Sequence, residues 1–162
     1  GALISGGATA SISESQFFGS TDLAVWVSDQ VGSSVTTTAH VDRSVASGGG
    51  GFAAQTANAG NRTRLFVSNS VASNNSSLGV MSFAPLGNAY VSVRSTELSG
   101  NANSGLYVSG AGAKLVAGDN TIQDNYSGMT QGGAGVLESA GGNVVRNNFF
   151  NLSGTIATFS RM

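Results

Sequence analysis

The feature that most constrains this chain is a short phrase repeated along it, in which an apolar residue is followed three places later by Asn or Ser. The clearest copies are GDNTIQDN, which begins at Gly118, and GGNVVRNN, which begins 23 residues later at Gly141. The same spacing recurs at intervals of 23 to 30 residues through the chain. Such a period is typical of repeat proteins, in which each copy is one supersecondary unit that stacks on its neighbours.

The copies indicate the kind of unit that repeats. The six pairs with this spacing are Phe17/Ser20, Val41/Ser44, Val71/Asn74, Leu98/Asn101, Ile122/Asn125 and Val145/Asn148. The apolar runs around them are short, rich in Val, Leu, Phe and Ile, and separated by Gly, Asn and Ser, as in β-strands joined by turns. No window holds the i, i+3, i+4, i+7 pattern of an amphipathic helix. We therefore expect an all-β fold, a parallel β-helix of about six coils with three short strands in each.

Stacking of coils explains the polar member of each pair. Equivalent residues in neighbouring coils lie about 4.8 Å apart, so an Asn in a turn can donate to and accept from the Asn above and below it. This predicts a polar ladder formed by Asn74, Asn101, Asn125 and Asn148, with Ser20 and Ser44 as weaker continuations. The apolar members are expected to form one buried stack that contains Val41, Val71, Leu98, Ile122 and Val145.

The phrases GDNTIQDN, GGNVVRNN and VSNSVASNN resemble the short parallel β-helix repeats of the pectate-lyase-like superfamily. The resemblance covers about residues 10–159. It implies a right-handed β-helix, which is also the hand that parallel crossovers prefer. We expect residues 1–162 to form a single β-helix domain, either as a fragment of a longer solenoid or as a protein whose uncapped ends meet another copy.

Composition excludes several classes of partner. Charged residues make up 9% of the chain, the formal net charge is −1, and the seven basic residues are scattered. Nucleic-acid binding is therefore not expected, because no basic cluster could follow a phosphate backbone. No run of 18 apolar residues could span a membrane as a helix. The chain has no cysteine, so we expect no disulfide and no thiolate metal site. We also expect no other metal site and no cofactor.

The acidic residues do not indicate a catalytic centre. Enzymes of the resembled superfamily cleave uronic-acid polymers with carboxylates that converge from adjacent coils. No two acidic residues of this chain share a position in adjacent copies of the repeat, although Glu138 and Lys114 are placed to approach one another. His40 is the only histidine and has no carboxylate motif around it, so we expect it at the surface or in a turn.

Aromatic side chains are the other candidates for chemistry, because sugar rings stack on flat aromatic faces. The candidates for a carbohydrate-binding surface are Trp26, Tyr90, Tyr107 and Tyr126. Their competing role is packing in the core or at its rim. The phenylalanines expected in the core are Phe17, Phe18, Phe66 and Phe149.

Two functional hypotheses follow from these features. The first is a non-catalytic, structural or adhesin-like β-solenoid, bacterial and secreted or at the cell surface. It would present a long face to a polysaccharide or another cell-surface ligand and would associate with itself through its terminal coils. The alternative is a carbohydrate-active β-helix, either a polysaccharide lyase or hydrolase or a polysaccharide-binding module.

Overall fold

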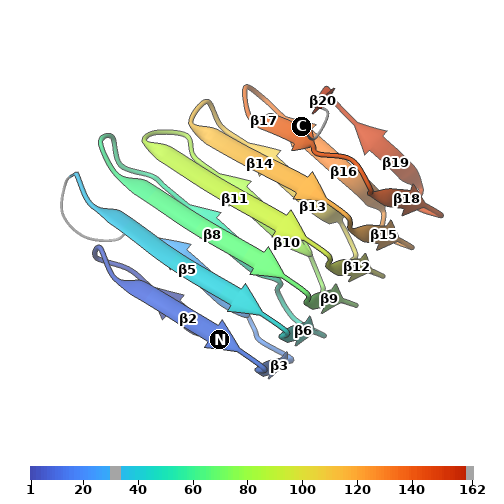
Figure 1. Ribbon diagram of the computed structural model, residues 1–162, viewed down its shortest axis with the longest axis horizontal. Helices are drawn as coiled ribbons and strands as arrows, with labels where there is room; N and C mark the ends of the chain where they lie inside the picture. Colours follow the sequence, from blue (N-terminus) through green and yellow to red (C-terminus); the bar gives the residue numbers. More distant parts are fainter. Residues whose placement is uncertain (30–33, 160–162) are drawn as a thin grey trace.

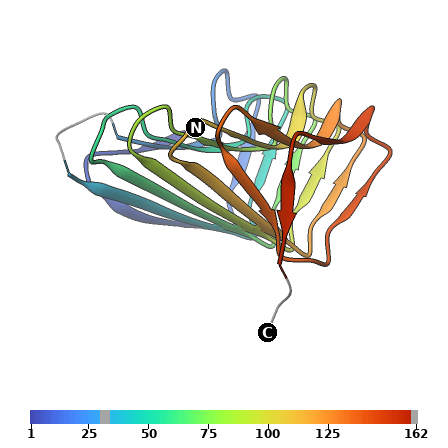
Figure 2. The same cartoon turned by 90° about the horizontal axis from the view of Figure 1, so that it is seen from above.

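The chain folds into a stack of parallel coils with three sides (Figure 1). This computed structural model describes residues 1–29 and 34–159, which contain twenty short strands and no helix. Each of the first six coils contributes one strand to each of three sheets, the last coil adds β19 and β20 to two of them, and equivalent strands of successive coils pair with one another. Figure 2 shows the successive coils following the same path around a common axis. The all-β, parallel β-helix prediction is confirmed.

The three sheets are named A, B and C in the order in which the chain visits them. Sheet A consists of β1 (Ala2–Ile4), β4 (Val25–Ser28), β7 (Phe52–Gln55), β10 (Val80–Phe83), β13 (Ser104–Ser109), β16 (Ser127–Gly132) and β19 (Phe150–Ser153). Sheet B consists of β2 (Thr9–Ser13), β5 (Thr36–Asp42), β8 (Arg62–Ser68), β11 (Asn88–Arg94), β14 (Ala113–Gly118), β17 (Val136–Ser139) and β20 (Ile156–Thr158). Sheet C consists of β3 (Gln16–Phe18), β6 (Val45–Ser47), β9 (Val71–Ser73), β12 (Glu97–Ser99), β15 (Thr121–Gln123) and β18 (Val144–Arg146).

The core runs along the axis between the sheets. Side chains alternate between the two faces of each strand, so every second residue points inward. In sheet B one inward row consists of Ala39, Leu65, Val91, Leu115 and Leu137. In sheet A the matching row consists of Val25, Phe52, Val80, Leu106 and Met129. All of these side chains are buried, so each coil covers the apolar interior of its neighbours.

The predicted apolar stack is right for its C-terminal half and wrong for Val71. Leu98, Ile122 and Val145 are cross-coil partners on the inner face of sheet C. The partner of Leu98 in the preceding coil is Ala72, which is buried, whereas Val71 lies half-buried on the outer face. The core position in this coil is filled by a small alanine. The larger valine beside it matched the apolar spacing in the sequence, although its side chain lies on the outer face.

Val41 is also buried, but in a different sheet from the one predicted. It lies on β5 of sheet B, between Ile12 and Val67 of the neighbouring coils. The sheet C position of the same coil is taken by Ala46. In both coils the residue that fills the core position of sheet C is an alanine. The search for a large apolar residue three places before Asn or Ser therefore selected a valine nearby.

A row of asparagines joins the coils at the turn from sheet C to sheet A, and we call it the first ladder. It consists of Asn75, Asn101, Asn125 and Asn148. The side-chain Nδ2 atom of each donates to the Oδ1 atom of the next, at 2.8, 2.8 and 2.9 Å. The same Oδ1 atoms accept the backbone N–H of the preceding member, at 3.2, 2.9 and 2.9 Å. The ladder thus satisfies buried turn groups in each coil.

The prediction that Asn74 belongs to this ladder is wrong by one residue. Asn74 is exposed and has a φ of 51°, whereas Asn75 is buried and hydrogen-bonded to Asn101. The residue before the ladder adopts the left-handed region in other coils too, for example at Asp124 and Asn147. Asparagine tolerates that conformation, so two adjacent asparagines here have two different roles.

The first ladder ends at Asn75. In the preceding coil the register places Gly49 at the ladder position, and a Cβ atom there would overlap the carbonyl oxygen of Ser20. Ser20 holds the corresponding position of the first coil, and no hydrogen bond joins its side chain to another described residue. The close approach of the two backbones therefore excludes a longer side chain at Gly49.

Ser44 belongs to a second ladder, at the turn from sheet B to sheet C, which the sequence reasoning missed. Its members directly precede the strands of sheet C, and they are Ser15, Ser44, Ser70, Thr96, Asn120 and Asn143. The backbone N–H of each donates to the side-chain oxygen of the next, at 3.1, 3.1, 3.5, 3.0 and 3.0 Å. Because three residue types fill one position, a search for asparagine alone could not find this row.

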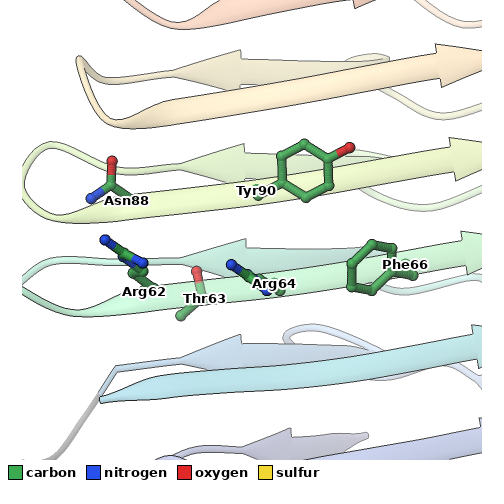
Figure 3. A pocket seen from close by; sticks show the side chains of 6 residues that line it. All are labelled: Arg62, Thr63, Arg64, Phe66, Asn88 and Tyr90. Atoms are coloured by element: carbon green, nitrogen blue, oxygen red, sulfur yellow. The ribbon is translucent and has the colours of Figure 1, made fainter. Parts of the chain in front are cut away.

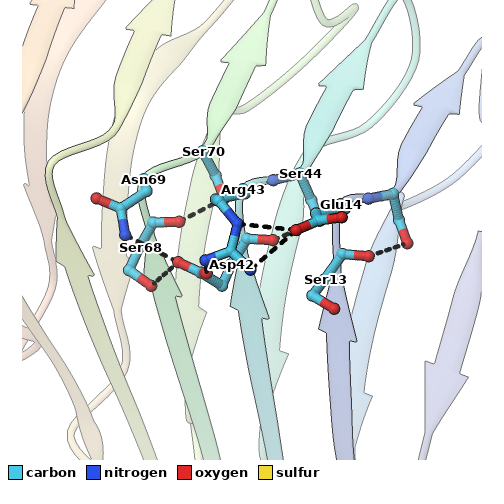
Figure 4. A network of polar contacts seen from close by, with 9 residues as sticks. Ser13, Glu14, Asp42, Arg43, Ser44, Ser68, Asn69 and Ser70 are labelled. Atoms are coloured by element: carbon cyan, nitrogen blue, oxygen red, sulfur yellow. Dashed lines mark hydrogen bonds and ion pairs between the residues drawn. The ribbon is translucent and has the colours of Figure 1, made fainter.

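Charged residues tie the N-terminal coils together beside the second ladder (Figure 4). The Arg43 guanidinium donates to Glu14 Oε1 at 3.1 and 3.2 Å and also pairs with Asp42. Asp42 Oδ1 accepts hydrogen bonds from Asn69 Nδ2 at 2.9 Å and Ser68 Oγ at 2.8 Å. These two side-chain bonds, with a smaller contribution from Arg43, lower the pKa of Asp42. The network connects three consecutive coils at one corner.

Asp29 fixes the segment between β7 and β8. Its buried carboxylate accepts hydrogen bonds from the backbone N–H groups of Ala57 and Asn58, and from the side chains of Asn58 and Asn61. Burial alone would raise the pKa of Asp29, but these donors outweigh it and lower the pKa below its usual value. Asp29 therefore stabilises the fold only while it is ionised.

A pH-dependent stability follows from this depressed pKa. The contribution of Asp29 should be fully present above the carboxyl pKa of the unfolded chain and should be lost as the pH falls through the lower pKa of the folded state. Asp29→Asn should cost about 1–3 kcal/mol near neutral pH, because the amide cannot accept all of these hydrogen bonds. Denaturant titrations from neutral to acidic pH should show the two proteins converging in stability. A difference independent of pH would contradict this role.

Candidate binding face on sheet B

The longest strands of sheet B carry an unusual set of outward side chains. β5, β8 and β11 each have seven residues and lie side by side. Their inward positions are apolar or Thr, which leaves every second residue on the outer face. The residues that gather there are His40, Arg62, Arg64, Phe66, Asn88 and Tyr90 (Figure 3 shows all but His40).

Three rings form a continuous row across three coils, which we call the aromatic row. The centroids of His40 and Phe66 lie 4.7 Å apart, and their planes differ by 10°. Phe66 and Tyr90 follow at 5.9 Å and 54°. Figure 3 shows the Phe66 and Tyr90 rings over adjacent strands, outside the sheet. His40 stacks on one face of Phe66, so the apolar surface that the row offers to a ligand is the rest of that ring and the Tyr90 ring.

Two arginines of β8 stand beside the aromatic row. Arg62 and Arg64 are exposed, and neither takes part in any of the three ion pairs found among the described residues. With Thr63, Phe66, Asn88 and Tyr90 they line an open groove of about 380 Å³. No Asp or Glu is among the described residues that line it. The groove combines apolar ring faces with side chains that donate hydrogen bonds.

The positive charge in the next coil, that of Lys114, is paired with a carboxylate. Lys114 is the register partner of Tyr90, and its Nζ atom donates to Glu138 Oε1 at 2.8 Å. The predicted approach of Lys114 and Glu138 is thereby confirmed. On this face, the cationic side chains that form no ion pair with a described residue are Arg62, Arg64 and, at the far end of β11, Arg94.

The structure does not bring the four predicted aromatic residues together. Tyr90 alone lies on sheet B, while Trp26 and Tyr107 occupy one outward row of sheet A with two coils between them. Tyr126 lies in the turn before β16 and stacks on Phe149 at 5.3 Å. The Trp26 Nε1 atom is buried and has no hydrogen-bond partner among the residues that the structure describes. A single platform made of these four residues is therefore wrong.

Three of the four phenylalanines predicted in the core lie outside it. Phe66 is on the outer face of β8, and Phe18 and Phe149 are 67% and 73% exposed. Only Phe17 packs against the core. Phe17 and Phe18 are neighbours on one strand, so they must point to opposite faces.

Metal-binding clusters are absent from the described parts of the chain. No group of three His, Asp or Glu side chains there could hold a metal ion. The described residues also contain no helix long and apolar enough to cross a membrane. His40, which was expected at the surface or in a turn, lies exposed on β5.

These features define a three-sided parallel β-solenoid with polar ladders at its turns and an open aromatic and basic face on one side. The chain belongs to the right-handed β-helix family, because the model of the family described as "Right handed beta helix region" matches residues 1–156. The match confirms the predicted right-handed coiling of the β-helix. It also fits the resemblance of the repeats to the pectate-lyase-like superfamily. Comparisons with curated proteins and with solved structures find no match.

Proposed function

We propose that the protein is a non-catalytic β-solenoid that binds a glycan on the outer face of sheet B. The observation that carries this proposal is the aromatic row of His40, Phe66 and Tyr90, flanked by Arg62 and Arg64, which form no ion pair with any residue that the structure describes. Such a face suits an adhesin-like protein that is secreted or held at a bacterial cell surface.

The chemistry of the groove supports a sugar ligand. The rings supply apolar faces on which the C–H face of a pyranose can stack, and the guanidinium and amide groups supply donors for its oxygen atoms. The groove is open along the sheet, so a polymer can lie across it. The strands beneath are fixed by ladder bonds at one end and by core packing, which keeps the cost of ordering the site low.

A binding panel with matched aromatic variants tests this function. The wild-type chain should retain at least one soluble glycan in affinity electrophoresis or calorimetry. Phe66→Ala or Tyr90→Ala should weaken that binding about tenfold, because each removes a stacking face. Tyr107→Ala, on sheet A, is the matched control and should leave the affinity unchanged. Equal losses in all three variants, or no binding to any glycan, would contradict the proposal.

An enzymatic alternative has one observation in its favour. Lys114 and Glu138 form an ion pair one coil away from Tyr90, on the same face, and both are groups that can transfer protons. A carbohydrate-active β-helix would release reducing or unsaturated ends from a polysaccharide, and Glu138→Gln would abolish that release. Binding without any release of ends supports the non-catalytic function.

Self-association through the terminal coils stays a prediction. The outer edges of β18, β19 and β20 pair with no other described strand, and Leu152 of β19 is 56% exposed. Unpaired edges beside apolar side chains favour pairing with another chain. We expect sedimentation equilibrium to show a dimer or larger species, which Leu152→Lys should weaken. A stable monomer at high concentration would contradict self-association.

A further inference from the structure

Four residues on sheet B form a compact rectangle of hydrogen-bond donors beside the aromatic row. Arg62 and Arg64 are two places apart on β8, which separates them by about 6.6 Å along the strand. The register pairs Arg62 with Asn88 and Arg64 with Tyr90 in the next coil, about 4.8 Å away. Figure 3 shows all four side chains over the same surface of the sheet.

The rectangle carries positive charge that is not engaged in an ion pair within the described parts of the chain. Neither the Arg62 nor the Arg64 guanidinium donates a hydrogen bond to another described residue. On sheet B, the Glu138 carboxylate pairs with Lys114 and the Asp42 carboxylate pairs with Arg43. In a chain with only 9% charged residues, two guanidinium groups in one groove, neither in an ion pair with a described residue, are a concentrated feature.

We propose that this groove binds a tetrahedral oxyanion, a phosphate or sulfate ester carried by a glycan whose ring stacks on Phe66 and Tyr90. The proposal rests on the glycan-binding function and names the chemical class of its ligand. The ring lies on the aromatic faces, and the ester extends along β8 between Arg62 and Arg64. The Asn88 amide supplies a further donor from the neighbouring coil.

The number and arrangement of donors favour an ester over a carboxylate. A carboxylate is planar and is matched by a single bidentate arginine. A phosphate or sulfate ester has three terminal oxygens in three directions, so it can accept from both arginines and from Asn88 together. A phosphate monoester carries a charge of about −1.5 to −2 near neutral pH, close to the combined charge of the two guanidinium groups.

The test compares polymers that differ only in the charged group. Calorimetry is run with a sulfated galactan and its desulfated form, with a phosphorylated mannan and its dephosphorylated form, and with polygalacturonate as the carboxylate arm. We expect at least one ester polymer to bind about tenfold more tightly than its stripped form and than polygalacturonate. The sulfate and phosphate arms identify which ester is preferred. High salt should weaken the ester binding more than the binding of the stripped polymers.

Variants locate the effect within the groove. Arg62→Gln and Arg64→Gln should each reduce the affinity for the ester polymer about tenfold and leave the affinity for the stripped polymer nearly unchanged. Arg94→Gln is the matched control, because Arg94 is also exposed on the outer face of β11 but lies outside the groove. Circular dichroism checks that every variant is folded.

The outcomes separate this inference from the proposed function. Equal binding of esterified and stripped polymers would overturn the inference and leave glycan binding intact. Polygalacturonate binding as tightly as the esters, or Arg94→Gln weakening the affinity as much as Arg64→Gln, would overturn it as well. If no polymer binds, the proposed function fails together with the inference.

Discussion

Replacing Asn125 with alanine should lower the free energy of unfolding by about 3 kcal/mol, since several buried groups lose their partners together. The Asn125 Oδ1 atom accepts from the backbone N–H and the side-chain Nδ2 of Asn101, at 2.9 and 2.8 Å. Its Nδ2 atom donates to the carbonyl oxygens of Leu98 and Gln123 and to Asn148 Oδ1, each at 2.9 Å. Alanine satisfies none of them, and the site is too buried for water to replace them freely.

A neighbouring substitution provides the control. Asp124 is exposed, so Asp124→Gly removes a polar side chain without disturbing the ladder. Its φ of 58° is in the left-handed region, which glycine adopts without backbone strain. Its stability should stay within about 0.5 kcal/mol of the wild type. Urea denaturation followed by circular dichroism measures both. Similar stabilities for Asn125→Ala and wild type would mean that the first ladder does not hold the coils together.

Leu98→Ala should cost about 3 kcal/mol, because it opens a cavity in the sheet C core. Leu98 is fully buried and in register with Ala72 and Ile122, and two alanines already occupy this row in the preceding coils. The coils on either side are held by backbone pairing, so they cannot collapse freely into the space. Ala72, the neighbour of Leu98 in the preceding coil, is too small to fill the space that the substitution leaves.

Val71→Ala gives the matched comparison, since Val71 was the predicted core residue of the adjacent coil. It lies half-buried on the outer face, so its replacement should cost less than about 1 kcal/mol. The same urea measurement serves for both variants. If Val71→Ala proved as destabilising as Leu98→Ala, the register of sheet C described above would be incorrect.

The architecture could be predicted because the same pattern of residues recurs in several successive coils. From Leu98 onward each coil has a large apolar residue inside sheet C and an asparagine three places later, so the spacing fixes strand, turn and ladder together. The earlier coils depart from this pattern. Ala46 and Ala72 fill their core positions, and Gly49 fills one ladder position, so the rule selected Val41, Val71 and Asn74 instead.

The binding face was harder to predict, because it depends on register across turns of unequal length. Phe66 lies between the buried Leu65 and Val67, and His40 lies between Ala39 and Val41, so strand alternation indicates that both point outward. That signal was present in the sequence. Their contact could not be read from it, because His40 and Phe66 come together only when β5 and β8 pair in one particular register.

Tyr90 illustrates the same limit. It is one of the four aromatic residues that were predicted as candidates, but its neighbours in the folded chain are Phe66 and Arg64, neither of which was considered with it. Trp26 and Tyr107 share a row of sheet A that the spacing of the repeat did not reveal. A candidate site in a solenoid becomes visible only when the residues of successive coils are aligned strand by strand.

The most direct test of glycan binding on sheet B is an NMR titration of the isotope-labelled chain with the glycan selected by the binding panel. If the glycan binds there, the largest chemical-shift changes will fall on the outward residues of β5, β8 and β11, above all on Arg64, Phe66 and Tyr90 and on the ring of His40. Changes centred on Trp26 and Tyr107 of sheet A, with sheet B undisturbed, would contradict binding on sheet B.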